Sequence, residues 1–91
     1  MMWLKRKFEK GTNGYEIERK DPTNQTWDCF DDNDVCLGFV FGTPGAIKAA
    51  VRHDYASGFS FRCVHSKAGV IHSTIEEARL AIERKIKAGG Q

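Results

Sequence analysis

Residues 26–41 hold the strongest apolar face of the chain, and they run Thr-Trp-Asp-Cys-Phe-Asp-Asp-Asn-Asp-Val-Cys-Leu-Gly-Phe-Val-Phe. Two runs rich in apolar and aromatic residues, 26–29 and 35–41, enclose a polar segment centred on residues 31–34. Asp and Asn favour turns because their short side chains bond to nearby backbone groups. The stretch therefore predicts a β-hairpin whose tip carries several carboxylates.

The register of this hairpin follows from which residues share a face. The second strand has a strong apolar face, made of Val35, Leu37, Phe39 and Phe41, and a weaker one, made of Cys36, Gly38 and Val40. Pairing Trp27 with Leu37 places every large apolar residue on one side of the sheet. The same register pairs Cys29 with Val35, whereas the alternative pairs Cys29 with Cys36. A slip by one residue moves every side chain to the other face, so burial favours the first register.

Two further strands are expected before the hairpin. Residues 3–9 alternate between apolar and charged side chains, which slightly favours a strand over a helix. Asn13-Gly14 is a strong signal for a tight turn, because both residues tolerate a positive φ angle. Residues 15–20 alternate again and predict a second strand, and a turn is expected at 21–24.

A first helix is expected directly after the hairpin. Thr43 is a good N-cap, and Pro44 suits the first helical position. Apolar residues at helical spacing follow between Ile47 and Tyr55, and Gly58 is suited to the end of the helix.

The last third of the chain predicts two short strands and a second helix. The strands are expected at 59–65 and 70–72, around a turn at 66–69. The helix is expected to begin at Thr74, which forms a capping-box pattern with Glu77, and to end at Gly89-Gly90.

Together these elements predict one α+β domain over residues 1–91. Its antiparallel sheet has five to six short strands and carries two α-helices packed on one face, in the order βββ(β)αββα. The large aromatics are then core residues, while Val40, Val64 and Leu80 point outward. Outward apolar residues, with Phe30 near the hairpin tip, are features of a covered face or a dimer interface. The chain is therefore expected to be a monomer or a homodimer.

The composition is typical of a soluble globular protein. The 91 residues are 41% hydrophobic and 29% charged, with a net charge of +2. No stretch approaches the roughly 18 apolar residues of a membrane-spanning helix, so no membrane association is expected. The three cysteines, Cys29, Cys36 and Cys63, are an odd and sparse set, which indicates the reducing cytoplasm rather than a disulfide scaffold.

The sequence holds no recognisable motif of an active site or a cofactor site. It lacks the glycine-rich phosphate-binding loops and the Gly-x-Ser-x-Gly turn of hydrolases. Cys63, His65 and His72 would share a face under one strand register, but no close pair of cysteines accompanies them. Core and sheet-margin positions explain these three residues better, so no enzyme, no cofactor and no metal is expected.

Charge is distributed unevenly along the chain. Residues 1–10 carry four basic side chains and one acidic one, while residues 28–34 carry four aspartates and no base. The expected function is a non-enzymatic protein-binding module of the kind that inhibits or regulates a larger complex. Small size, a bipolar surface and the lack of an active-site motif are features of many phage and mobile-element accessory proteins. The expected partner-binding site is the acidic hairpin tip, made of Asp28, Phe30, Asp31, Asp32 and Asp34.

Nucleic-acid binding is the alternative function. It would use the basic N-terminal strand and the basic end of the last helix, and the residues of that strand are Lys5, Arg6, Lys7 and Lys10. A sheet with exposed aromatics could also stack single-stranded bases, but the favoured register buries the aromatics in the core.

Overall fold

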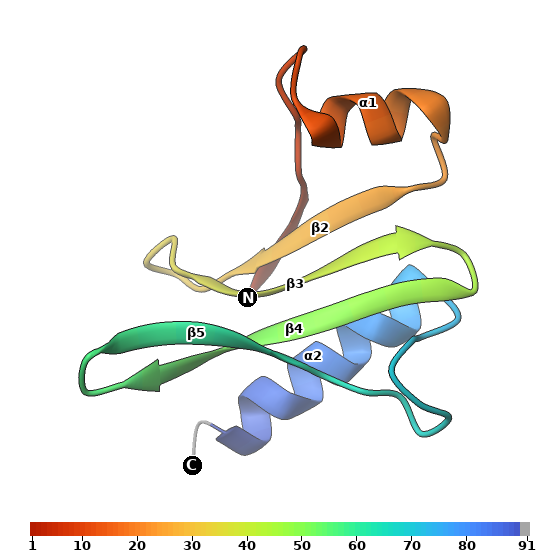
Figure 1. Cartoon of the computed structure of the whole chain (residues 1–91). Helices are drawn as coiled ribbons and strands as arrows, with labels where there is room; N and C mark the ends of the chain where they lie inside the picture. Colours follow the sequence, from red (N-terminus) through yellow and green to blue (C-terminus); the bar gives the residue numbers. More distant parts are fainter. Residues whose placement is uncertain (90–91) are drawn as a thin grey trace.

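The computed structural model describes residues 1–89, which form a five-stranded antiparallel sheet and two helices (Figure 1). In chain order the elements are β1 (Met2–Lys5), α1 (Asn13–Lys20), β2 (Gln25–Phe30), β3 (Cys36–Thr43), β4 (Ala46–Tyr55), β5 (Gly58–Cys63) and α2 (Ile75–Gly89). The strands lie in the sheet in the same order. The predicted α+β class is confirmed, and neither helix of the described part is long and apolar enough to cross a membrane. Gly90, expected to end the last helix, lies outside the described residues.

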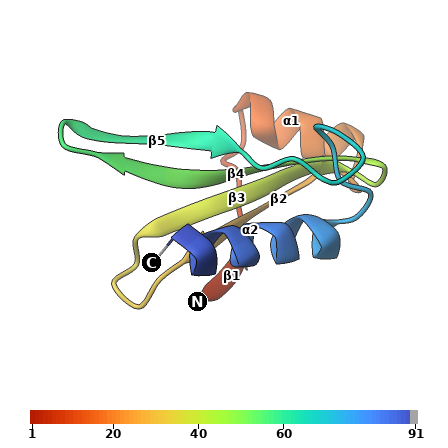
Figure 2. The same cartoon turned by 90° about the horizontal axis from the view of Figure 1, so that it is seen from below.

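Helix α2 covers one face of the sheet and forms the core with it (Figure 2). The buried core residues are Val40, Ile47, Ala49, Ala78 and Ile82. Gly38 lets the helix approach closely, because a Cβ there would lie 3.2 Å from Cγ2 of Ile82 and 2.6 Å from the carbonyl oxygen of Ala50. The weak apolar face of β3 is therefore the core face, since α2 supplies the bulk that β3 lacks.

The observed register reverses the predicted faces of the β2–β3 hairpin. Trp27 pairs with Val40, and Cys29 pairs with Gly38. Residues directly opposite each other share a face of the sheet. Trp27 and Cys29 therefore face α2, and the phenylalanines of β3 lie on the opposite side. Val40 is fully buried, so the prediction that it points outward is wrong.

The hairpin loop explains why the predicted pairing of Cys29 with Val35 is wrong. The backbone N–H of Asp31 donates to the carbonyl oxygen of Val35 at 3.0 Å. The Asp31 carboxylate also accepts the N–H groups of Asn33 and Val35, at 2.8 and 3.0 Å. Residues 31–35 thus form a closed loop, and β2 continues to Phe30 after a register shift. The predicted pairing of Trp27 with Leu37 fails for the same reason.

Residues 15–20 belong to a helix instead of the predicted strand. Thr12 is its N-cap, because the Thr12 hydroxyl accepts the N–H of Tyr15 at 3.2 Å. Glu16 and Arg19 lie one turn apart and form an ion pair of 2.7 Å. Six residues are too few for alternation alone to separate a strand from a short capped helix.

Residues 46–55 form a strand instead of the predicted helix. Thr43 pairs with Ala46, which leaves Pro44 and Gly45 as a two-residue turn between β3 and β4. Gly45 has a φ of 84°, as the third position of a type II turn requires. Thr-Pro-Gly therefore marks a hairpin here, although the same residues are good helix starters.

The two helices lie on opposite sides of the sheet, so the prediction that both pack on one face is wrong (Figure 2). On the α2 side, the Arg79 guanidinium lies over the rings of Trp3 and Trp27, at 5.1 and 5.5 Å from their centroids. Helix α1 instead packs against the chain that follows β1. There, Gly14 has no side chain to obstruct the ring of Phe8.

The chain between β5 and α2 is attached to β4 by His72. The predicted strand at 70–72 is reduced to one bridge, in which His72 and Ile47 exchange backbone hydrogen bonds of 2.7 and 3.0 Å. The His72 side chain is 1% exposed, and its Nε2 lies 2.8 Å from the carbonyl oxygen of Val64. Val64 is half-buried and packs against the core, which also contradicts its predicted outward position.

Helix α2 begins as the capping-box pattern predicts. The Thr74 hydroxyl accepts the N–H of Glu77 at 3.1 Å. The Glu77 carboxylate in turn accepts the N–H of Ser73 at 3.3 Å. Leu80 is 51% exposed on the outer side of this helix, as expected.

Strands β4 and β5 extend beyond the rest of the sheet as a two-stranded ribbon (Figure 1). Strand β3 pairs with β4 only as far as Val51, whereas β5 pairs with β4 as far as Tyr55. Residues 52–55 and their partners in β5 are therefore covered by no further strand of the described chain.

Candidate binding face

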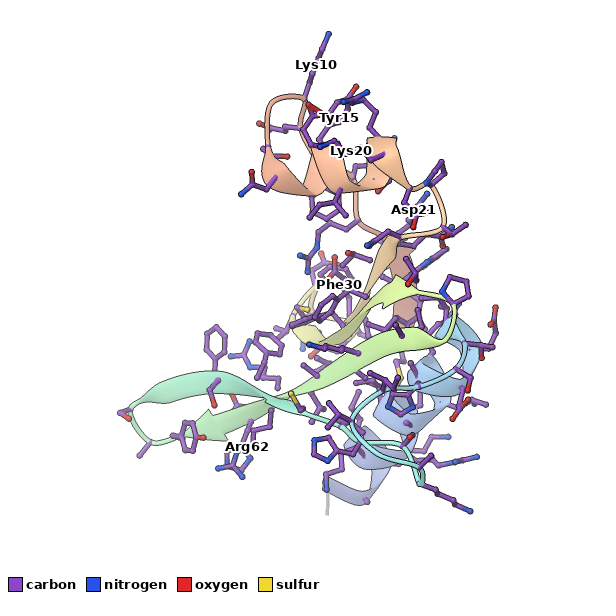
Figure 3. The ribbon with its side chains drawn as sticks, turned by 45° about the vertical axis from the view of Figure 1, so that its right-hand side comes forward. Lys10, Tyr15, Lys20, Asp21, Phe30 and Arg62 are labelled. Carbon is purple, nitrogen blue, oxygen red and sulfur yellow. The ribbon has the colours of Figure 1, made fainter. Side chains whose placement is uncertain are left out.

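The face of the sheet opposite α2 is open and aromatic. Its aromatic residues are Phe30, Phe39, Phe41, Phe59 and Phe61. Phe59 is 54% exposed, and Phe41 and Phe61 are each 37% exposed. Figure 3 shows the side chains of this face, with Phe30 labelled. Clustered apolar rings that remain accessible in a small domain mark an interaction surface. We refer to this surface as the aromatic face.

Four of the rings form a row across the sheet. The ring centroids are 5.8 Å apart for Phe41 and Phe39, 5.2 Å for Phe39 and Phe61, and 5.9 Å for Phe61 and Phe59. The row crosses β4 at Ala50, which pairs with Phe39 and is too short to separate the rings on either side. The row is therefore continuous from β3 to β5.

Three basic side chains lie beside the row. The Arg52 guanidinium lies 3.8 Å from the ring centroid of Phe59, and the Arg6 guanidinium lies 5.6 Å from that of Phe39. Lys48 is exposed on β4, on the same face. The surface thus combines exposed aromatic rings with positive charge, and Arg52 lies over the ring of Phe59 as a cation–π contact.

Arg6 is held on the aromatic face by Asp28. Asp28 is 8% exposed and accepts two hydrogen bonds from the guanidinium, at 2.9 Å from Nε and 2.5 Å from Nη2. The hydrogen bond to Asp28 outweighs the effect of burial and raises the pKa of Arg6. Arg6 is therefore a fixed positive charge, and both oxygens of Asp28 are already occupied.

The five residues of the predicted acidic tip do not form one site, because two of them lie in β2 and three in the loop. Asp28 lies within β2 and is paired as described, and Phe30 is half-buried at the end of that strand. Asp31 uses its carboxylate to close the loop. Asp32 and Asp34 are exposed at the loop itself, and Asp34 has a φ of 61°. A partner at the tip would meet these two carboxylates.

The structure also divides the predicted basic strand. Arg6 belongs to the aromatic face, whereas Lys5 pairs with Glu18 of α1 at 3.7 Å. Lys7 and Lys10 are exposed in the connection that leads to α1, where Figure 3 labels Lys10. Arg6 therefore adjoins the row of rings, and Lys5, Arg6 and Lys7 together line a groove between the connection and α1.

The candidate metal ligands differ in exposure, since His65 is exposed like Cys63. Cys63 is exposed at the end of β5, whereas His72 is buried and bridges to β4. In the described part of the chain, no group of three His, Cys, Asp or Glu side chains is placed to hold a metal ion.

The three cysteines are free thiols with different accessibility. Burial, with a further contribution from Glu83, raises the pKa of the Cys29 thiol to about 11. Because the thiolate is the reactive species, we expect iodoacetamide at about pH 8 to modify Cys63 in the folded protein but to spare Cys29. Peptide mass spectrometry with and without urea measures this difference. Equal labelling of Cys29 and Cys63 in the absence of urea would contradict the buried position of Cys29.

The residues of β4 and β5 that complete the aromatic face are not predicted from the sequence. Lys48 and Arg52 fall within the segment predicted as a helix, and Phe59 and Phe61 were predicted to be buried. The available signal was the alternation in β4, where Lys48, Ala50 and Arg52 share one face and Ile47 and Ala49 share the other.

Comparisons of the chain with protein-family models, curated proteins and solved structures find no match. Its class is therefore defined by its own fold and surface: a small α+β domain with one covered and one open sheet face.

Proposed function

We propose that this protein is a non-enzymatic binding module that holds single-stranded nucleic acid on the aromatic face. The observation that carries the proposal is the row of four phenylalanine rings, of which Phe41, Phe59 and Phe61 are exposed, beside Arg6, Lys48 and Arg52. Base faces stack on aromatic side chains regardless of sequence, and basic side chains hold the phosphates. Aromatic side chains buried in the core, as the sequence predicts, could not stack on bases. The structure instead exposes the rings of Phe41, Phe59 and Phe61.

The geometry suits an extended strand better than a duplex. Successive ring centroids are 5.2 to 5.9 Å apart, and the pairs Phe39–Phe61 and Phe61–Phe59 meet edge to face, at interplanar angles of 63° and 89°. Bases that stack on such rings must turn independently of each other, which the unpaired bases of a single strand can do. In a duplex the bases are stacked on each other, and their faces are not available to a protein surface. The proposed ligand is therefore single-stranded DNA or RNA, with little sequence preference.

The charge of the aromatic face predicts a shallow salt dependence. Three basic residues contact at most about three phosphates, so log K should fall with log salt with a slope of about −2 for a single strand. Arg52 also pairs with Asp54 at 2.9 Å, and Arg6 pairs with Asp28, so the slope should not be steeper. Stacking then supplies most of the affinity.

Fluorescence anisotropy with a labelled oligothymidylate tests the proposal. We expect binding at low salt, the shallow slope given above, and weaker binding of a duplex of equal length. Equal affinity for the duplex, or no binding to any single strand at low salt, would contradict the proposal.

A protein partner is the other candidate ligand, and its support is the exposed pair Asp32 and Asp34 at the hairpin tip. Carboxylates on a closed loop can meet a basic surface on another protein. This outcome would be indicated by a purified partner that binds the wild-type chain but not the variant with Asp32→Asn and Asp34→Asn, while oligothymidylate fails to bind.

A further inference from the structure

The outer edge of β5 has unpaired backbone groups. Within the described residues β5 is the last strand of the sheet, and it pairs with β4 alone. The N–H of Val64 donates to the carbonyl of Ala49 at 2.9 Å, which directs that N–H toward β4. Directions alternate along a strand. The N–H groups of Phe59, Phe61 and Cys63 therefore point outward, together with their carbonyl groups.

This edge carries little of the usual protection against pairing, because Arg62 is its one charged side chain. Edge strands are normally blunted by proline, lysine, a bulge or a covering segment. Residues 58–63 run Gly-Phe-Ser-Phe-Arg-Cys, with no proline and no lysine. The ribbon that carries them projects from the sheet as two strands only, and an isolated two-stranded ribbon is marginally stable in water. A further strand on this edge would stabilise it.

A second copy of β5 is complementary to the first. In an antiparallel pair about a two-fold axis through Ser60, Phe59 of one copy lies opposite Phe61 of the other, on the aromatic face. Arg62 then lies opposite Gly58, so no like charges face each other. Because the N–H groups of Phe59 and Phe61 both point outward, they meet as a hydrogen-bonded pair in this register.

We propose that the chain forms a two-fold homodimer through its β5 edges, giving a continuous ten-stranded sheet. The aromatic rows of the two copies then join at Phe59 and Phe61 into one surface. The dimer deepens the proposed function, because a strand of nucleic acid would find twice the length of aromatic face. The dimer itself is measured without nucleic acid, so its failure and that of the proposed function can be distinguished.

Substitutions at Ser60 test both the pairing and its register. Ser60→Asp places two carboxylates directly opposite each other at the two-fold axis, and Ser60→Lys places two ammonium groups there. We expect the wild-type chain to sediment as a dimer at micromolar concentrations, and each variant to dissociate at least about tenfold more readily. An equimolar mixture of the two variants should regain the dimer, because opposite charges then meet.

A matched pair of variants separates the backbone from the side chain. Phe61→Pro removes the outward N–H but leaves the ladder to β4 intact, whereas Phe61→Ala removes only the ring. We expect a monomer for the first variant and a retained, weaker dimer for the second. Circular dichroism checks that both remain folded. A wild-type chain that sediments as a monomer, or a mixture of the Ser60 variants that stays monomeric, would overturn the proposal.

Discussion

Replacing Phe39 and Phe41 together by alanine is expected to weaken the binding of oligothymidylate by about 30-fold or more. Each ring that stacks on a base contributes about 1–3 kcal/mol, and these two rings form one end of the row, with centroids 5.8 Å apart. Both belong to β3, away from the β5 edge, so dimerisation should be unaffected. Fluorescence anisotropy at fixed salt measures the change.

Leu80→Ala is the matched control for the loss of an apolar side chain. Leu80 is 51% exposed but lies on the outer side of α2, away from the aromatic face. The Leu80→Ala variant should bind the oligonucleotide with the affinity of the wild type. If the double variant of Phe39 and Phe41 remains folded and binds equally well, the aromatic face is not the nucleic-acid site.

Replacing Ile82 by alanine is expected to destabilise the fold by about 2–5 kcal/mol. Ile82 is fully buried, and its Cγ2 atom lies against the position of Gly38, where the sheet offers no side chain of its own. The cavity left by alanine cannot be filled from β3. Domains of this size are stable by only about 5–15 kcal/mol, so the loss is a large fraction of the total.

Urea unfolding followed by circular dichroism measures this effect. The same control, Leu80→Ala, removes a similar side chain from the exposed side of the same helix and should change stability by no more than about 0.5 kcal/mol. Similar losses for the two variants would mean that α2 does not pack through Ile82 as described.

The sequence patterns predicted the class of the fold and its last helix better than the position of the core. The capping box of Thr74 and Glu77 is local, so it could be recognised without knowing what α2 covers. The core face of β3 could not be recognised in this way, because it depends on what α2 packs against. Gly38 and Val40 make a weak apolar face by themselves, and they become the core only when Ile82 fills the space above them.

Two segments were assigned the wrong element because short patterns satisfy two structures. Residues 15–20 alternate like a strand, yet the Thr12 cap and a pair of charges one turn apart support a helix. Pro44 and Gly45 suit the start of a helix as well as a hairpin turn, and pairing between β3 and β4 decides between them. Local propensity yields to tertiary pairing in such cases.

The location of the candidate site depends on which face of β3 is buried. Burial was expected to follow the strongest apolar face, and that assumption placed Phe39 and Phe41 in the core. The structure places them on the open side, where Phe61 joins them from β5 across the short side chain of Ala50. Long-range pairing brings these rings together, and no local pattern in the sequence carries that information.

We propose that the aromatic face, rather than the α2 side or the hairpin tip, holds the ligand. Titration of ¹⁵N-labelled protein with oligothymidylate, followed by amide chemical shifts, locates the bound strand on the surface. We expect saturable shifts at residues of the aromatic face, such as Phe39, Lys48, Arg52 and Phe61, with α2 little changed. Shifts confined to residues 31–35 or to α2, or no saturable shifts at low salt, would contradict it.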